Sequence, residues 1–179
     1  MRVVAGELRG RRLASPPRGA DVRPTSDRVR EAIFSILGDI SGAGVLDLFC
    51  GTGALAIEAI SRGAPRATLV DDHISLAQAN VDKLDLDDRC TLVRADVLRF
   101  LRRDPGSYEL VFCDPPYRLA DRLEGKLESL VAPRLAKGGR LIVESAARRP
   151  LQLGLPTLSK HGYGDTVVTI HGHTEGASG

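Results

Sequence analysis

Residues 43–58 constrain the fold of this chain more than any other stretch. The apolar run 45–48 has the length of a buried strand, and a turn of small residues with Gly51 and Gly53 follows it. Apolar residues from Ala54 onward then open a helix. Strand, glycine turn and helix in this order build a nucleotide-type site at the carboxyl edge of a parallel sheet. The sequence therefore predicts an α/β fold in which this turn carries a ligand.

Asp47 lies before the turn, and its position says which kind of ligand is expected. A turn that binds pyrophosphate directs helix N–H groups at negative charge and gains nothing from a carboxylate there. A ligand with an ammonium group beside a sulfonium would gain from one. Gly51 and Gly53 would let the backbone approach such a ligand where any Cβ would collide. We therefore expect S-adenosylmethionine, although residues 51–56 alone also satisfy the loose G-x-G-x-x-G/A pattern of NAD-binding domains.

Acidic residues also follow the next two predicted strands. Asp71 comes after the apolar run 67–70, and in a doubly wound fold its carboxylate can accept hydrogen bonds from two ribose hydroxyls. Asp96 follows the third strand, where its side chain could accept one from an adenine amine. Three acids at the ends of three successive strands, beside one glycine turn, indicate a single binding site. For Asp72, a capping or solvated role competes with ligand binding.

The fourth predicted strand, 108–113, ends in Asp114-Pro115-Pro116-Tyr117. The two prolines stiffen this turn and withhold their N–H groups, so nearby carbonyls face outward. Asp114 and the Pro115 carbonyl could then accept hydrogens from one exocyclic amine, and the Tyr117 ring could stack on a planar base. The amine lone pair would point at a methyl donor, and proximity would supply most of the acceleration. A rigid turn with a buried tyrosine is the structural alternative.

The rest of the chain alternates between apolar runs of strand length and helical patterns. Residues 2–13 have the pattern of two short strands around a glycine turn, and a helix capped by Thr25, Ser26 or Asp27 should follow as far as Leu37. Further helices are expected at 53–62, 74–84, 97–103 and 120–136, and further strands at 90–93, 140–144, around 158 and at 167–170. Strands spaced by helices imply a mostly parallel sheet covered on both faces, and the final strand pair implies an antiparallel addition.

Charge is distributed unevenly, although the net charge of the 179 residues is only +2. Residues 1–30 hold eight arginines and three acids, which gives a local balance of +5. A basic leading segment is typical of a nucleic-acid partner, and an arginine-rich solvated arm is the alternative. No apolar run reaches membrane-spanning length, and the amino terminus has no hydrophobic signal core. Three widely spaced cysteines without metal-ligand spacing indicate a reduced, cytoplasmic protein.

With these residues considered together, the chain resembles the class I methyltransferases. More narrowly, it resembles the RsmD-type bacterial 16S ribosomal RNA guanine-N2 methyltransferases. The most specific stretches are 2–13, 23–34, 47–58, 114–117 and 163–166. The resemblance implies a Rossmann-like, seven-stranded, mostly parallel sheet with an antiparallel C-terminal strand pair and a short N-terminal basic β-hairpin. It also implies S-adenosylmethionine as donor and a guanine in 16S ribosomal RNA, or in a small-subunit assembly intermediate, as acceptor.

The resemblance assigns roles to individual residues. The cofactor set is Asp47, Phe49, Gly51, Thr52, Gly53, Asp71, Asp72, Asp96, Val97 and Asp114; the catalytic set at the target base is Asp114, Pro115, Pro116 and Tyr117; the RNA-binding candidates are Arg9, Arg11, Arg12, Arg23, Arg28 and Arg30. Some of these arginines could instead hold the cofactor carboxylate or structure the hairpin. The sequence departs from the family at 70–73, where Val/Ile-Glu-x-Asp is more usual, and the shorter Asp71 reaches a ribose less easily.

We expect a basic hairpin or arm at 1–24, a methyltransferase domain at 25–171 and a disordered tail at 172–179, in a monomer without membrane or metal. Three other functions stay open. An amine methyltransferase acting on DNA adenine or protein glutamine would share the Asp114 turn, but no span is free for a DNA-reading domain. A non-catalytic rRNA-binding assembly factor would have a decayed site, against which the intact Asp114 and Tyr117 argue. An NAD-dependent oxidoreductase has no evident use for that turn.

Overall fold

The computed structural model of the chain describes residues 1–16, 26–123 and 125–173. Helices and strands alternate along most of it. The helices are α1 (Asp27–Leu37), α2 (Ala54–Ser61), α3 (Ser75–Lys83), α4 (Val97–Arg103), α5 (Ala120–Leu123) and α6 (Leu127–Val131), with 3-10 turns η1 (Tyr117–Leu119) and η2 (Ala132–Arg134). The strands are β1 (Gly44–Leu48), β2 (Arg66–Asp71), β3 (Cys90–Arg94), β4 (Tyr108–Cys113), β5 (Leu135–Ala146), β6 (Thr157–Tyr163) and β7 (Thr166–Gly172).

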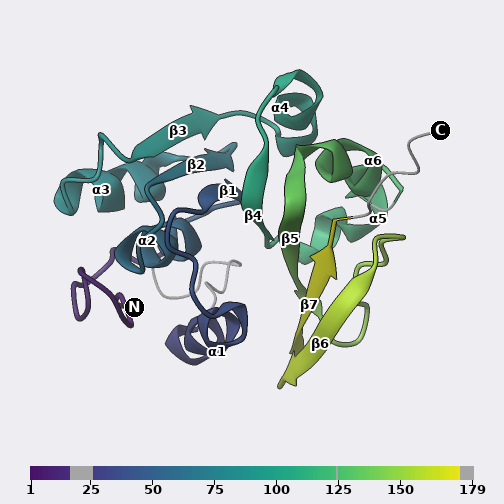
Figure 1. Cartoon of the computed structure of the whole chain (residues 1–179), viewed down its shortest axis with the longest axis horizontal. Coiled ribbons are helices and arrows are strands. Elements are labelled where there is room, and N and C mark those ends of the chain that lie inside the picture. Colours follow the sequence, from purple (N-terminus) through teal and green to yellow (C-terminus); the bar gives the residue numbers. More distant parts are fainter. Residues whose placement is uncertain (17–25, 124, 174–179) are drawn as a thin grey trace.

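The strands form one seven-stranded sheet in the order β3-β2-β1-β4-β5-β7-β6 (Figure 1). Strands β1 to β5 pair in parallel, whereas β7 lies antiparallel between β5 and β6. This confirms the predicted mostly parallel sheet with an antiparallel C-terminal pair. The strand order reverses between β1 and β4, and ligands of open α/β sheets bind beyond the carboxyl ends of the strands at such a point.

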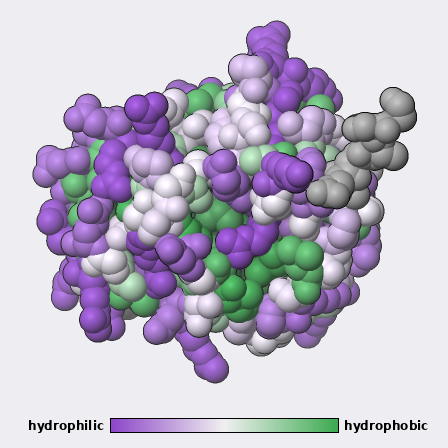
Figure 2. Space-filling view, in the orientation of Figure 1, coloured by the Kyte–Doolittle hydropathy of each residue, from purple (hydrophilic) through white to green (hydrophobic). Residues whose placement is uncertain are grey.

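Two apolar clusters cover the two faces of the sheet. On one face, residues of α1, α2 and α3 pack with Val45, Phe112, Ile142 and Val168. On the other face, residues of α4 and α6 pack with alternate residues of the same strands, because successive side chains of a strand point to opposite faces. Figure 2 shows a largely hydrophilic surface on the viewed side, with apolar side chains gathered toward its centre. The clusters hold the strands rigidly behind the edge where the two predicted turns emerge.

Helix α1 follows the predicted pattern closely. Ser26 is its N-cap, and the Ser26 side chain accepts a hydrogen bond from the Val29 N–H at 3.2 Å. The helix ends at Gly38, whose φ of 70° favours glycine. The apolar stripe, including Ile33 and Phe34, is buried against the sheet. The predicted cap and the predicted buried face are confirmed.

The expected helix 120–136 is wrong, because the chain breaks there into α5, α6 and η2 before β5 begins at Leu135. Gly125 has a φ of 74°, outside the helical range, and a proline stands at the start of η2. Strand β5 is also longer than the expected 140–144. Its register against β4 jumps before Arg140, so only the regular part of the strand matched the apolar pattern.

The N-terminal segment 1–14 packs on α2, and backbone hydrogen bonds from the Val3 N–H to the Arg11 carbonyl oxygen and from the Leu13 N–H to the Met1 carbonyl oxygen join its two ends. The expected β-hairpin stays a prediction. A single antiparallel bridge joins Arg2 and Arg12, and no strand is assigned between them. Val3 and Leu13 are buried in the same cluster as α1 and α2, which fixes the segment to the body of the protein. Within the described residues, no helix is long and apolar enough to cross a membrane. The division at 24/25 stays a prediction. Gly172, the first residue of the expected disordered tail, belongs to β7, and residues 174–179 lie outside the described residues.

Candidate active site

Strands β1 and β4 bring the glycine turn and the Asp114 turn together. Leu48 of β1 pairs with Cys113 of β4, and the Asp114 N–H donates to the Leu48 carbonyl oxygen at 3.4 Å. Both strands run in the same direction, so the residues that follow them leave the sheet side by side (Figure 1). The two turns on which the predicted chemistry depends are therefore neighbours at one edge of the sheet.

The turn after β1 has an unusual backbone. Phe49, Gly51 and Gly53 have positive φ angles of 61°, 52° and 74°. The Gly53 N–H donates to the Cys50 carbonyl oxygen at 2.7 Å, and the Gly51 N–H donates to Asp71 Oδ2 at 2.9 Å. A bulky residue rarely adopts the conformation of Phe49, so these hydrogen bonds hold a strained turn in place. Strain of this kind is concentrated at functional sites.

The two glycines of the turn serve different needs. A Cβ at Gly51 would meet no atom within 4 Å, so the space beside it is open to a ligand. A Cβ at Gly53 would lie 2.8 Å from Leu69 Cδ2 and 3.4 Å from the Ala77 Cβ. The sequence predicted that a Cβ would collide with a ligand at both glycines. At Gly53 it would instead collide with the protein, because β2 and α3 approach the turn there. Thr52 between them is buried.

Asp47 lies beneath the turn. Its side chain is 1% exposed, and its Oδ2 accepts a hydrogen bond from the Ala56 N–H in the first turn of α2 at 3.1 Å. Burial raises the pKa of Asp47 to about 7; the Ala56 hydrogen bond opposes that rise, and the Asp71 carboxylate adds to it. A cationic group bound above the turn would stabilise the ionised form. The Asp47 carboxylate would therefore favour the binding of a positively charged ligand.

Asp71 is half-buried and joins β2 to the same turn. Its Oδ2 holds the Gly51 N–H, and its Oδ1 accepts from the His73 N–H at 2.9 Å. Burial raises the pKa of Asp71, while these two hydrogen bonds lower it. Asp72 is exposed, and its hydrogen bond with the His73 ring lowers the pKa of Asp72. Of the two acids, Asp71 is the one attached to the glycine turn.

A small pocket next to the turn brings the third predicted acid close to Phe49. The pocket is lined by Phe49, Asp96, Val97, Leu98, Leu119, Arg122 and Leu123. Asp96 caps α4, since its Oδ1 accepts from the Arg99 N–H at 2.9 Å, and its Oδ2 lies 3.7 Å from Arg122 Nη2. Apolar walls with a carboxylate among them suit a flat heteroaromatic ring that carries an amino group.

Asp114 and the prolines continue from the end of β4. Asp114 and Pro116 are half-buried and Pro115 is buried. The Pro116 carbonyl oxygen accepts from the Leu119 N–H at 2.8 Å at the start of η1. The side chain of Tyr117 lies outside the described residues, so its stacking on a base stays a prediction.

Of the five predicted RNA-binding arginines that the structure describes, four are exposed and one is buried. Arg9, Arg11, Arg12 and Arg28 are exposed, whereas Arg23 lies outside the described residues. Arg30 is 0% exposed and therefore not placed to contact a phosphate, which corrects that expectation. Its guanidinium is instead held inside the protein, with Nε 3.4 Å from Glu58 Oε2 and Nη2 2.9 Å from Asp27 Oδ1.

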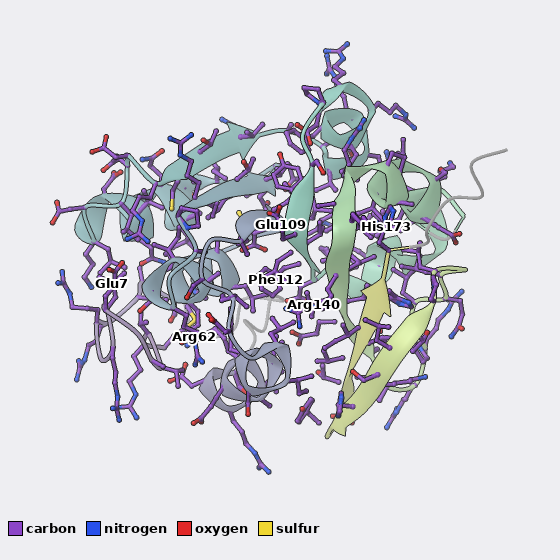
Figure 3. The ribbon with its side chains drawn as sticks, viewed as in Figure 1. Glu7, Arg62, Glu109, Phe112, Arg140 and His173 are labelled. Atoms are coloured by element: carbon purple, nitrogen blue, oxygen red, sulfur yellow. The ribbon has the colours of Figure 1, made fainter. Side chains whose placement is uncertain are left out.

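Arg30 belongs to an N-terminal clamp, by which we mean Glu58, Ser61, Arg30 and Arg62 with the backbone of residues 4–8. Glu58 is 0% exposed and accepts from the Val4 and Ala5 N–H groups at 2.8 and 3.0 Å, and from Arg62 Nε at 2.8 Å. The Ser61 hydroxyl donates to the Ala5 carbonyl oxygen and accepts from the Leu8 N–H. Figure 3 shows Glu7 of the segment and Arg62, the residue after α2, on the same side of the molecule. The clamp fixes the base of the basic segment to α2.

Two site residues were not predicted from the sequence. Asn80 of α3 is 0% exposed and donates from Nδ2 to the Thr52 carbonyl oxygen at 2.9 Å, while its Oδ1 accepts from the Ala14 N–H at 2.6 Å. It thereby ties the glycine turn to the N-terminal segment, a contact that no local pattern signals. Glu144 near the end of β5 lies on the strand next to Asp114. An acid near the carboxyl end of a predicted strand was the signal that could have found it.

Comparison with known proteins agrees with this geometry. The family model described as conserved hypothetical protein 95 matches residues 1–171. "Putative rRNA methyltransferase YlbH" of Bacillus subtilis is 34% identical, over 96% of this chain and 98% of its own length. "Ribosomal RNA small subunit methyltransferase D" of Escherichia coli K12 is 34% identical, over 88% of this chain and 79% of its own. The solved structure "Putative methyltransferase yhhF from Escherichia coli" matches with a TM-score of 0.82 at 30% identity, over 97% of both chains.

Proposed function

We propose that this chain, which belongs to the conserved hypothetical protein 95 family and is an RsmD-like methyltransferase, methylates the exocyclic N2 amine of a guanine in 16S ribosomal RNA. The family membership confirms the resemblance seen in the sequence. The N2 amine and the small-subunit RNA are the finer part of the proposal. The observation that best supports methyl transfer is the pairing of β1 with β4, which sets the glycine turn beside Asp114. The similarity to "Ribosomal RNA small subunit methyltransferase D" supports the small-subunit RNA as substrate.

The donor is S-adenosylmethionine, and the residues around the glycine turn fit it. The open space beside Gly51 would admit the methionine end, and the buried Asp47 carboxylate below would favour a positively charged ligand. Asp71, half-buried and bonded to the turn, would accept the ribose hydroxyls. The pocket with Phe49, Asp96 and Val97 would take the adenine. The bound cofactor supplies an electrophilic methyl group on a sulfonium.

Asp114 and the Pro115 carbonyl would prepare the target amine. The lone pair of an exocyclic amine is delocalised into the base, so the free amine is a poor nucleophile. Two acceptors that hold its hydrogens would rotate the lone pair toward the methyl group. Because the amine becomes acidic once it is alkylated, Asp114 does not need to be a strong base. Holding the reactants in line would then contribute most of the rate.

The exposed arginines Arg9, Arg11, Arg12 and Arg28 would hold the RNA backbone. Guanidinium groups suit bidentate contacts with phosphates, and such contacts make binding salt-dependent. The clamp keeps the base of the 1–14 segment fixed on α2, so the exposed arginines of that segment would meet the RNA on a prepared surface. The target guanine has to leave its stack to reach Asp114, which favours a loop or a partly assembled subunit as substrate.

The test is methyl transfer by Asp114→Ala. Small subunits from a methylase-deficient strain receive labelled S-adenosylmethionine, and the modified nucleotide is mapped. We expect the wild type to label one guanine at N2 and Asp114→Ala to transfer nothing, while calorimetry gives nearly unchanged affinity for S-adenosylmethionine. Asp88→Ala, at an exposed turn, serves as the matched control with full transfer. Loss of cofactor binding in Asp114→Ala, or absence of label in ribosomal RNA with the wild type, would contradict the proposal.

A further inference from the structure

Two carboxylates leave the sheet on neighbouring strands. In the parallel pair of β4 and β5, Cys113 pairs with Val143. One step further along, the same register sets Asp114 next to Glu144. Glu144 is still part of β5, where it also pairs with Val168 of the antiparallel strand β7. Adjacent strands are about 4.8 Å apart, so both side chains can reach the same small ligand group.

The two side chains also belong to the same face of the sheet. Phe112 and Ile142, two residues before them, pack in the cluster with α1 and α2. Cys113 and Val143, the intervening residues, pack in the cluster on the opposite face. Because side chains alternate along a strand, Glu144 projects to the face of Phe112 and Ile142. Asp114 is the first residue after β4, and its N–H still bonds to β1, so we infer that the alternation continues and sets its side chain on the same face. Asp47 pairs with Phe112 and lies on this face as well.

The floor beneath the two carboxylates is apolar and rigid. The ring of Phe112 lies between β4 and α1 (Figure 3), with its centroid 5.6 Å from that of Phe34. Glu144 is 9% exposed and Asp114 is half-buried, so hydrogen bonds to them are strengthened by the low local dielectric. Both residues already have an interaction within the chain, but a carboxylate offers about four acceptor positions.

Two adjacent acceptors match one particular base edge. Guanine presents two neighbouring donors there, the N1–H and the N2 amine, whereas adenine has an acceptor at N1. We propose that Glu144 accepts the N1–H of the target guanine while Asp114 accepts a hydrogen of its N2 amine, so that Glu144 is the residue that selects guanine. This inference rests on the proposed function. A site that hydrogen-bonds a substrate N–H strongly rejects analogues that lack it, because the buried acceptor is then left unpaired.

The competing explanation is that Glu144 only supports the fold. Its loss would then lower methylation of every substrate by the same factor. Base selection instead predicts that the effect of changing Glu144 depends on the hydrogen at N1. The two explanations are separated by 2-aminopurine, which keeps the N2 amine and carries an acceptor at N1.

The experiment first maps the modified nucleotide with the wild type, and then places guanine or 2-aminopurine at that position of 16S RNA assembled into small subunits. For each enzyme, kcat/KM is measured on both substrates and expressed as a ratio. Any loss of folded protein cancels in this ratio. Glu144→Gln is the test variant, and Glu144→Asp, which keeps the carboxylate, is the second. Glu109→Gln is the matched control, because Glu109 lies on β4 at the opposite edge of the sheet, where its carboxylate accepts from the Gly44 N–H (Figure 3).

We expect the wild type and Glu109→Gln to prefer guanine by about a hundredfold, and Glu144→Gln to lose at least about tenfold of that preference. Glu144→Asp should retain more of the preference than Glu144→Gln. Equal ratios in the wild type and both Glu144 variants would overturn the role of Glu144, while transfer to guanine by the wild type would leave the proposed function standing. Transfer to neither substrate by the wild type would instead remove the proposed function, and this inference with it.

Discussion

Two buried carboxylates lie at the two ends of helix α2, and they have different partners. At the amino end of α2, the Asp47 carboxylate accepts a hydrogen bond from the Ala56 N–H, and burial raises the pKa of Asp47 to about 7. At its carboxyl end, Glu58 is equally buried but receives two backbone N–H groups and two guanidinium groups. Burial disfavours the ionised form of Asp47, and a cationic ligand would stabilise that form. The Glu58 carboxylate is neutralised by the protein and holds the N-terminal segment in place.

This difference separates a site prepared for a ligand from a site that completes the fold. A buried charge without sufficient partners costs stability, and such a cost is retained where function needs it. A buried charge that is fully paired costs little while it stays intact, but becomes expensive when one partner is removed. The two ends of α2 should therefore respond oppositely to neutralisation of their carboxylates.

The largest effect is expected for Glu58→Gln. The variant keeps the shape of the side chain but removes the Glu58 charge beside the buried Arg30 guanidinium, and we expect a loss of about 3–5 kcal/mol of stability. Urea unfolding measures this loss, and hydrogen exchange should show early opening at the Val4 and Ala5 amides. Glu31→Gln, at an exposed position of α1, is the control and should change stability by less than about 0.5 kcal/mol. Equal stability of the two variants would show that the clamp does not anchor the segment.

The two ends of α2 also differ in how well the sequence predicts them. Asp47, Asp71, Asp96 and Asp114 could be placed at one edge because each follows or ends a strand in a regular βα pattern, and parallel topology brings such ends together. Glu58 gives no comparable signal, since its partners Val4 and Ala5 lie 54 and 53 residues away along the chain. Arg30 was wrongly assigned to RNA because its pairing with Glu58 likewise gives no local signal in the sequence.

The C-terminal half shows the limit of periodicity. The apolar pattern continues across 120–136 and suggests one helix, but Gly125 and the proline of η2 break it. Glu144 ended a predicted strand just as the other acids do, and it was missed because it was counted with an apolar run. The mostly parallel sheet and its antiparallel C-terminal pair were accessible from pattern, whereas helix breaks and buried ion pairs depend on tertiary contacts.

Neutralisation of Asp47 should have the opposite sign. The unfolded chain releases the Asp47 proton near its ordinary pKa of 3.8, while the folded protein keeps it up to about pH 7. Between these values the folded state binds more protons, so stability falls as pH rises, by up to about 4 kcal/mol. Asp47→Asn should remove most of this fall and be more stable than the wild type at pH 8. The raised pKa of Asp71 acts in the same direction and should leave a residual slope.

Urea unfolding between pH 5 and pH 8 checks this prediction. Asp39→Asn is the control, since Asp39 is exposed and its hydrogen bonds to Ser41 lower its pKa, so this variant should keep the wild-type slope. Calorimetry with S-adenosylmethionine completes the comparison, because Asp47→Asn should bind more weakly at pH 8 despite its greater stability. A variant that is less stable at pH 8 and binds normally would mean that Asp47 is a structural residue like Glu58.

The smallest effects concern the glycines between the two carboxylates, and they divide stability from binding within a single turn. Gly53→Ala places a Cβ 2.8 Å from Leu69 Cδ2 at a φ of 74°, so we expect a loss of about 1–3 kcal/mol in urea unfolding. Gly51→Ala suffers only from its φ of 52°, about 1 kcal/mol, because its Cβ meets no protein atom within 4 Å. The methyl group would instead enter the ligand's space, so calorimetry with S-adenosylhomocysteine should show the greater loss of affinity in Gly51→Ala. The reverse order, with affinity lost at Gly53 and kept at Gly51, would place the ligand on the wrong side of the turn and would remove the electrostatic reason for a buried, under-paired Asp47.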